Sequence, residues 1–238
     1  MSQAILEVRD LEKGFGGVKA LNGLSLAIAP GELVCIIGPN GAGKSTFFKL
    51  LMGLEMPSAG RIFFRGRDIT RLPLFKRARL GLGIKFQNMN VYQELSVYQN
   101  LFIPLRRHHK PDEIRQQIGD LLQQLHLAGT EDEPVQNLSH GQQQWLAIGM
   151  SIALEPEVLL LDEPAAGMSP EETRATAAIV KRLNRQGVTV GVIEHDMMFI
   201  RSLNARTTVL HHGRLFAEGT YEDIERNEDV HRIYLGKV

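Results

Sequence analysis

The chain has 238 residues, a length that suits one large domain or a core with a subdomain. Its 27 basic residues balance its 27 acidic residues, which argues against a chain-wide attraction to nucleic acid or to acidic lipid. The only cysteine, Cys35, excludes an intramolecular disulfide and a zinc-binding cysteine cluster, and we interpret it as a small buried side chain.

No stretch approaches the roughly eighteen consecutive apolar residues that a membrane-spanning helix requires. The first residues, MSQAILEVRD, also lack an apolar segment long enough for a signal peptide. We therefore expect a cytoplasmic, soluble chain, which partner proteins must hold at a membrane if it works there.

The N-terminal region predicts β-structure around one unusual aromatic residue. Alternating apolar and polar residues predict strands over 5–8 and 18–28, the second with a turn at Asn22-Gly23. Between them, glycines flank Phe15 on a loop and leave its face uncovered. The sequence leaves two roles for Phe15 open, which are stacking on a planar base and packing into the core as a loop anchor.

The stretch GPNGAGKST, residues 38–46, fits the phosphate-binding loop pattern Gly-x-x-x-x-Gly-Lys-Ser. An apolar run at 33–37 predicts a buried strand before it, and residues 44–54 predict a helix after it. The glycines let consecutive N–H groups form an anion nest, and the helix adds its positive N-terminal end. Lys44 supplies a cation for the β- and γ-phosphates, and the hydroxyl of Ser45 is placed to bind magnesium.

The next segments predict a short strand, a basic helix and a second strand, over 61–65, 73–80 and 82–86. Gln87 follows the second strand, where it would face the nucleotide side of an open α/β sheet. Taken alone, Gln87 would rather be interpreted as a polar surface residue. Four basic residues are interpreted as a solvated helix face: Arg71, Lys76, Arg77 and Arg79.

Residues 96–155 have a different pattern. Three amphipathic runs over 96–105, 111–127 and 139–154 predict helices, and no strand pattern interrupts them. We therefore expect an all-helical insert. Trp145 on the third helix either packs within the insert or contacts a partner, and the sequence does not decide between these roles.

Alternation of strands and helices returns after the insert. The expected strands are 158–161, 188–193, 207–210 and 215–218, and the expected helices are 170–186 and 197–203. Thr220 with Asp223 predicts the cap of a final helix. We interpret the histidine pairs at 108–109 and 211–212 as surface loops whose adjacent side chains diverge. The whole pattern predicts an α/β fold.

Three polar residues follow buried strands and predict a catalytic group. Asp162 ends an aliphatic strand, where a carboxylate is costly unless it faces a cavity or a cation, so we assign it to the magnesium held by Ser45. Glu163 points to the other side of the extended chain and can polarise a water in line with the γ-phosphate. His195 can contact the same phosphate, although a lone histidine at a strand end is more often structural.

The stretch LSHGQ, residues 138–142, predicts a helix start with a capping box between Ser139 and Gln142. One interpretation is simply a well-capped helix. The other is a second anion site, in which Gly141 allows close backbone approach to the nucleotide of another subunit.

Taken together, these motifs resemble the ATP-binding cassette (ABC) ATPases over essentially the whole chain. They follow the family order: the adenine-loop aromatic Phe15, Walker A at 38–45, the Q-loop at Gln87, the signature at 138–142, Walker B at 158–163 and the switch histidine His195. The resemblance implies a RecA-like P-loop NTPase core with an N-terminal antiparallel β subdomain and an inserted α-helical subdomain. The single domain 1–238 would divide into about 1–95 and 156–238 for the first two parts and about 96–155 for the helical signature subdomain.

The resemblance also implies a composite site, in which each ATP lies between Walker A of one cassette and the signature of another. The ATP-binding residues would be Phe15, Val18, Asn40, Gly41, Ala42, Gly43, Lys44, Ser45 and Thr46. Glu163, His195 and Gln87 would be catalytic; Ser45, Gln87 and Asp162 would hold Mg²⁺; and Ser139, Gly141 and Gln142 would contact the ATP of the partner subunit.

Two positions depart from the commonest family pattern. His140 stands where glycine is usual in the signature, which puts in doubt how closely the partner's γ-phosphate is approached. Ser169 stands where aspartate is common in the D-loop, which puts in doubt the usual contact across the dimer. Neither is interpreted as inactivating, because Lys44, Glu163 and the other catalytic groups are present.

The stretches LSHGQQQWLAIGM, DEPAAGM and IEHDM resemble the branched-chain amino-acid and urea uptake group of cassettes. Membership would imply a second cassette, identical or homologous, two transmembrane permease subunits and an external substrate-binding protein as partners, with no nucleic acid. It would place the chain on the inner face of the cell membrane. Two alternatives remain: a non-transport single cassette of the cluster-assembly type, and an ATP-binding regulator without turnover.

Overall fold

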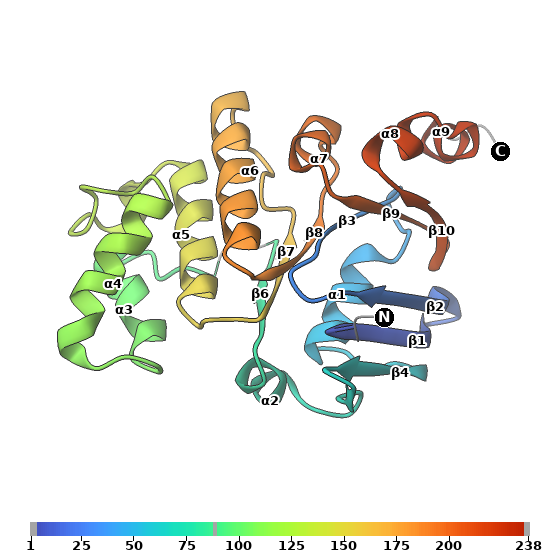
Figure 1. The fold of residues 1–238 in the computed structure, drawn as a ribbon, viewed down its shortest axis with the longest axis horizontal. Helices are drawn as coiled ribbons and strands as arrows, with labels where there is room; N and C mark the ends of the chain where they lie inside the picture. Colours follow the sequence, from blue (N-terminus) through green and yellow to red (C-terminus); the bar gives the residue numbers. More distant parts are fainter. Residues whose placement is uncertain (1–3, 88–89, 236–238) are drawn as a thin grey trace.

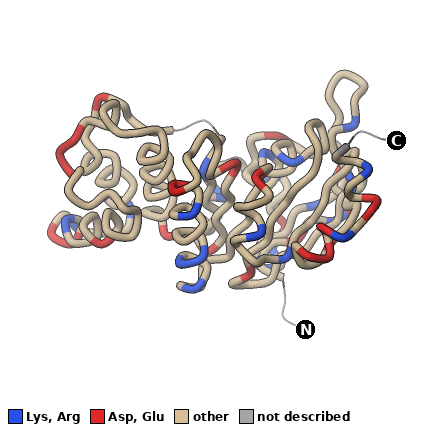
Figure 2. Tube along the Cα trace, turned by 90° about the horizontal axis from the view of Figure 1, so that it is seen from above, with Lys and Arg blue, Asp and Glu red and all other residues tan. Residues whose placement is uncertain are grey.

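The structure, a computed structural model, describes residues 4–87 and 90–235. Its chain forms a four-stranded antiparallel sheet, a six-stranded sheet and a set of helices that lie together at one end (Figure 1). Acidic and basic residues are interspersed along the trace in both the sheet-containing and the helical parts (Figure 2). Within the described residues, no helix is both long and apolar enough to cross a membrane.

The antiparallel sheet has the order β2-β1-β4-β5. Its strands are β1 (Leu6–Phe15), β2 (Val18–Ile28), β4 (Ala59–Phe64) and β5 (Arg67–Asp68). The prediction of a loop around Phe15 is wrong, because Phe15 ends β1 and pairs with Val18. Gly16 and Gly17 alone form the hairpin turn, and both have positive φ, as a tight turn between right-twisted strands requires.

The predicted turn at Asn22-Gly23 is also wrong, because β2 continues through it. Leu24 pairs with Leu11 and Asn22 pairs with Glu12, so Gly23 is left over as a bulge in the strand. Gly23 has a φ of 77°. Gly23 therefore has the positive φ that is typical of Asn-Gly turns, but here it lies in a bulge and the chain does not reverse direction.

The larger sheet has the order β10-β9-β3-β8-β7-β6. Its strands are β3 (Leu33–Ile37), β6 (Leu82–Lys85), β7 (Val158–Asp162), β8 (Thr189–Ile193), β9 (Arg206–His211) and β10 (Arg214–Gly219). All neighbours are parallel except β10, which pairs antiparallel with β9. The carboxyl ends of the parallel strands therefore lie at one edge, where ligands bind in open α/β sheets.

Helices cover both faces of this sheet (Figure 1). They are α1 (Lys44–Met52), α2 (Leu74–Arg79), α6 (Pro170–Arg185), α7 (Met197–Leu203), α8 (Tyr221–Glu225) and α9 (Glu228–Leu235). Alternate side chains of β7 enter two different cores. Val158 and Leu160 pack with α1 and the antiparallel sheet, whereas Leu159 and Leu161 pack with α6 and α7. This arrangement confirms the predicted α/β fold class.

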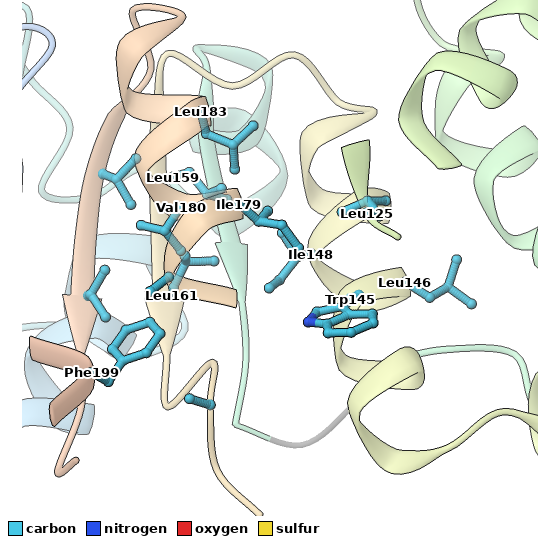
Figure 3. Close-up of a cluster of buried hydrophobic side chains, with 14 of the residues drawn as sticks. Leu125, Trp145, Leu146, Ile148, Leu159, Leu161, Ile179, Val180, Leu183 and Phe199 are labelled. Atoms are coloured by element: carbon cyan, nitrogen blue, oxygen red, sulfur yellow. The ribbon is translucent and has the colours of Figure 1, made fainter. Parts of the chain in front are cut away.

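The three predicted helices are α3 (Val97–Leu105), α4 (Pro111–Gln124) and α5 (His140–Ile152), and the short η1 (Val135–Asn137) before α5 is an addition that the sequence did not predict. Trp145 joins this part to the core, because its Nε1 donates to Thr176 Oγ1 of α6 at 2.8 Å. Figure 3 shows Ile179, Val180 and Leu183 of α6 among the buried side chains between β7 and α5. Trp145 therefore packs within its own chain.

The interpretation of the basic residues around α2 as a solvated face is wrong for Arg77. This side chain is fully buried, and its guanidinium donates to the carbonyls of Leu50 and Leu51 at 2.6 and 2.7 Å. It also donates to the carbonyls of Thr70 and Leu72. Arg77 thus donates to carbonyls at the C-terminal end of α1, and the Leu50 carbonyl also accepts from the N–H of Gly53.

The prediction for the histidine pair at 211–212 is wrong for His211 and for the divergence of the two side chains. His211 is the last residue of β9 rather than part of a loop. The ring centroids of His211 and His212 lie 4.0 Å apart, so these adjacent side chains do not diverge. At the other pair, His109 Nε2 lies 2.7 Å from Glu155 Oε1 and ties the end of the α3–α4 connection to the residues after α5.

Candidate functional site: a nucleotide site at the carboxyl edge of the sheet

The phosphate loop connects β3 to α1 and depends on glycine for close packing. A Cβ atom at Gly38 would lie 2.2 Å from the carbonyl oxygen of Leu210, and one at Gly43 would lie 2.4 Å from that of Ala20. Gly43 also has a φ of 102° and is the N-cap of α1. It offers no side-chain hydrogen bond to the helix, so the first N–H groups of α1 remain available for an anion.

Lys44 is buried inside this loop. Its Nζ donates to the carbonyl oxygens of Gly38 at 2.7 Å and Pro39 at 3.1 Å. Burial lowers the pKa of Lys44, while the carboxylates of Glu163 and Asp162 oppose that shift. The loop thus holds a cation against its own carbonyls, beside two carboxylates.

Asp162, the last residue of β7, is buried. Among the described residues, its Oδ1 has no hydrogen-bond partner. Burial and the neighbouring charge of Glu163 raise the pKa of Asp162 to about 6. An unpaired buried acceptor is costly, and a cation at this oxygen would remove the cost. Carboxylate, hydroxyl and amide oxygens are the hard donors that Mg²⁺ prefers, so the chemistry of Asp162, Ser45 and Gln87 fits the ion.

Both carboxylate oxygens of Glu163 have partners that come from neighbouring strands. Gln87 Nε2 donates to Glu163 Oε2 at 2.7 Å, and His195 Nε2 lies 2.7 Å from Glu163 Oε1. Gln87 follows β6 and His195 follows β8, on the two sides of β7. The structure thus brings together the three residues that the sequence predicts as catalytic.

Sequence reasoning missed two buried charged residues at the same edge. Lys85 ends β6, and its Nζ lies 3.4 and 3.3 Å from the carbonyl oxygens of Asp162 and Glu163. Glu194 follows β8 and accepts hydrogen bonds from the N–H groups of Ala165 and His195. The available signal was a charged residue at the end of an otherwise apolar strand, the same signal that identified Asp162.

Phe15 is 46% exposed, so it is not a core anchor. Its ring centroid lies 4.7 Å from Lys13 Nζ. Val18, its partner across the hairpin, is 70% exposed. The Lys13 ammonium thus lies over the Phe15 ring, and the exposed remainder of the ring is the part that could stack on a base.

The signature segment begins α5 and forms the predicted capping box. Ser139 Oγ accepts from the N–H of Gln142 at 3.2 Å, and Gln142 Oε1 accepts from the N–H of Ser139 at 2.9 Å. A Cβ at Gly141 would lie 2.2 Å from Oε1 of Glu172 in α6. The side chain of Glu172 therefore leaves no room for a Cβ atom at position 141, and the sequence did not reveal this requirement for glycine.

The two departures from the family pattern have local roles. The His140 imidazole turns toward its own chain, with Nε2 3.0 Å from the carbonyl oxygen of Ala166. Ser169 is the N-cap of α6, and its Oγ accepts from the N–H of Glu172 at 3.3 Å. His140 thus connects the signature segment to the residues that follow Glu163, and Ser169 fixes where those residues enter a helix.

The chain matches known proteins along its whole length. A family model described as "ABC transporter" matches residues 21–166. The chain is 36% identical to the high-affinity branched-chain amino acid transport ATP-binding protein BraF of Pseudomonas aeruginosa, with 100% of both chains covered.

Solved structures show the same fold. The ADP conformation of an ATP-binding cassette of an ABC transporter is 28% identical, with a TM-score of 0.89, over 99% of this chain and 100% of that chain. A dimeric post-hydrolysis state of an ATP-binding cassette with ADP and phosphate is 26% identical, with a TM-score of 0.82, over 91% of this chain and 98% of that chain.

Proposed function

Because the chain belongs to the ABC transporter family of ATP-hydrolysing cassettes, we propose that it is the ATP-binding subunit of an import transporter for branched-chain amino acids, urea or related small polar solutes. The full-length similarity to a branched-chain amino acid transport subunit supports this class of cargo. The partners would be a second cassette and two membrane permease subunits, which would hold the chain at the inner face of the membrane. An external binding protein would deliver the solute.

One observation carries the proposed chemistry, namely the carboxylate of Glu163 held between Gln87 and His195. In this position Glu163 accepts a proton from the water that attacks the γ-phosphate. His195 orients the carboxylate and contacts the γ-phosphate, and Gln87 fixes the second carboxylate oxygen. The hydrogen bonds to both oxygens limit rotation of the carboxylate, which keeps it aligned with the attacking water.

The nucleotide would be held by residues that remain available in this structure. Phe15 and Val18 present an exposed surface for the base, and residues 40–46 surround the phosphates through backbone N–H groups and Lys44. Ser45, Gln87 and Asp162 would hold Mg²⁺, which supplies positive charge to the β- and γ-phosphate oxygens when bound.

The signature residues would complete the site of a second subunit. Ser139, Gly141 and Gln142 would approach the γ-phosphate bound by the partner cassette. Two observations support this role: the start of α5 is exposed at Ser139 and His140, and a cassette of the same fold forms a dimer with ADP and phosphate. Closure of the pair would then drive the membrane subunits.

Substitution Glu163→Gln tests the chemistry. It preserves the size of the side chain but removes the proton acceptor, so the variant should bind ATP normally, accumulate as an ATP-bound dimer and lose turnover. Glu171→Gln, an exposed change at the start of α6, serves as the matched control. Near wild-type hydrolysis by Glu163→Gln would show that another group is the base.

Co-purification from membranes tests the transport role. A tagged chain should retain two permease subunits, and uptake of labelled leucine or urea by the intact complex should depend on ATP. A chain that instead retains soluble scaffold proteins would fit the cluster-assembly type. A chain that binds ATP without turnover, even in the presence of its co-purified partners, would be a regulator.

A further inference from the structure

Two buried side chains of opposite charge flank the end of β7. Lys85 approaches from β6 on one side, and Glu194 approaches from the end of β8 on the other. They are 2% and 3% exposed, respectively. Burying a charge is expensive unless it is paired or hydrogen-bonded, so each residue requires a reason for its position.

Within the described chain, Lys85 and Glu194 do not form an ion pair with each other. Each instead contacts backbone groups whose partial charge is opposite to its own. The Lys85 ammonium faces the carbonyl oxygens of Asp162 and Glu163 at 3.4 and 3.3 Å. The Glu194 carboxylate accepts from the N–H of Ala165 at 2.8 Å through Oε1, and from the N–H of His195 at 2.9 Å through Oε2. The Lys85 ammonium therefore donates to backbone carbonyl groups, and the Glu194 carboxylate accepts from backbone N–H groups.

The residue between these contacts has an unusual backbone conformation. Glu163 has a φ of 49°, in the left-handed region that non-glycine residues adopt at a cost. Its own N–H donates to the carbonyl oxygen of Ile193 at 2.9 Å. Such a conformation persists only when the surrounding structure fixes it, and here contacts from both neighbouring strands do so.

We propose that Lys85 and Glu194 are positioning residues for ATP hydrolysis, which together hold Glu163 in its left-handed conformation and so aim its carboxylate. This inference rests on the proposed role of Glu163 as the base. Glu194 in addition fixes the N–H of His195, so it positions both members of the Glu163–His195 pair. Neither residue needs to contact ATP.

A purely structural role predicts a different outcome. If the two residues only neutralise each other's charge, removing both together should restore whatever removing one destroys. Single changes leave one charge buried without its counterpart and are expected to destabilise the fold. The double variant Lys85→Met/Glu194→Gln removes both charges while preserving the approximate shapes, so it separates stability from catalysis.

The experiment measures ATP affinity, thermal unfolding and single-turnover hydrolysis for the full chain, together with its membrane subunits if the isolated chain turns over too slowly. The double variant should bind ATP within about twofold of wild type and unfold cooperatively, yet hydrolyse about 100-fold more slowly, as expected when a catalytic group is displaced by about 1 Å. Lys76→Met and Glu222→Gln are exposed changes of the same chemistry on α2 and α8 and should hydrolyse ATP normally.

A double-mutant cycle then asks whether the pair acts through Glu163. In the Glu163→Gln background, adding Lys85→Met/Glu194→Gln should not slow the residual hydrolysis further, because the aimed group is already gone. The proposal fails if the double variant hydrolyses ATP near the wild-type rate, or if its loss adds fully to that of Glu163→Gln. Normal turnover by Glu163→Gln alone would instead overturn the role of Glu163 as the base.

Discussion

Two helices of this chain begin at candidate phosphate contacts, and they begin in opposite ways. The N-cap of α1 is Gly43, which provides no side-chain hydrogen bond to the helix, whereas Ser139 and Gln142 close a full capping box at the start of α5. An uncapped helix end has N–H groups that still need acceptors, and a capped one has already satisfied part of them. The difference suggests that α1 provides the primary affinity for ATP, and that α5 contributes only after a second subunit closes.

The largest expected effect is at the uncapped helix. Lys44→Ala removes the buried cation of the phosphate loop and should weaken ATP binding about 100-fold, as expected for loss of one partner of a buried charged contact. Fluorescence titration with an ATP analogue measures the change, and Lys49→Ala, an exposed change on the same helix, serves as the control. An affinity for ATP within threefold of wild type would contradict the view that the start of α1 provides the primary affinity.

The second prediction concerns Asp162, beside the uncapped helix. Its pKa is raised to about 6, so the folded chain holds this proton more tightly than the unfolded chain, and the resulting stability is present below about pH 4 and lost as the pH rises through about 6. Asp162→Asn should therefore stabilise the magnesium-free chain at pH 7 by up to about 3 kcal/mol, from about 1.4 kcal/mol for each pKa unit, and by little at pH 4.

Thermal unfolding at the two pH values, with and without magnesium, measures the effect of Asp162→Asn. Magnesium should stabilise wild type more than the variant, because only wild type retains the carboxylate. A variant that is less stable than wild type at pH 7 without magnesium would show that the Asp162 carboxylate is compensated by protein groups.

The third prediction concerns the capped helix. Ser139→Ala should cost about 1 kcal/mol of stability through loss of the N-cap, but should leave ATP affinity of the isolated chain unchanged. Ser139→Asn, which can still cap, should retain stability. Chemical denaturation and ATP titration give the two quantities, and a clear loss of ATP affinity in the isolated chain would place the signature in the primary site.

The smallest expected effect is at His140. His140→Ala removes the hydrogen bond to the carbonyl oxygen of Ala166 and should cost about 0.5–1 kcal/mol. Faster hydrogen exchange should be confined to residues 165–169 and the start of α5. Unchanged exchange in both segments would mean that His140 does not connect them.

Recurrent local patterns made much of the fold and the candidate site predictable. The phosphate loop, the strand before Asp162 and the capping box at Ser139 depend on residues close in sequence, and their backbone requirements select particular residue types. The turn predicted at Asn22-Gly23 is a bulge in the structure, because a glycine with positive φ suits both and the pairing with β1 decides between them.

What the sequence did not reveal depends on neighbours from distant segments. Arg77 looked solvated because its helix is basic, but its partners are carbonyls of α1, 26 and 27 positions earlier. Lys85 meets the end of β7 from 77 positions away, and Glu194 reaches Ala165 across 29. Periodicity within one segment carries no information about such partners, so only the assembled sheet identifies them.

Arg77 has a consequence for how variants of this protein are interpreted. Its guanidinium holds the far end of the helix whose first residue is Lys44, so loss of Arg77 should loosen α1 from the end opposite the phosphates. A genetic screen for inactive cassettes would then recover Arg77 together with the nucleotide-binding residues. Loss of activity at this position would reflect a destabilised α1 rather than a lost contact to ATP. Variants of Arg77 should therefore unfold at a lower temperature, whereas variants of the ATP-binding residues should not, although both would lose transport.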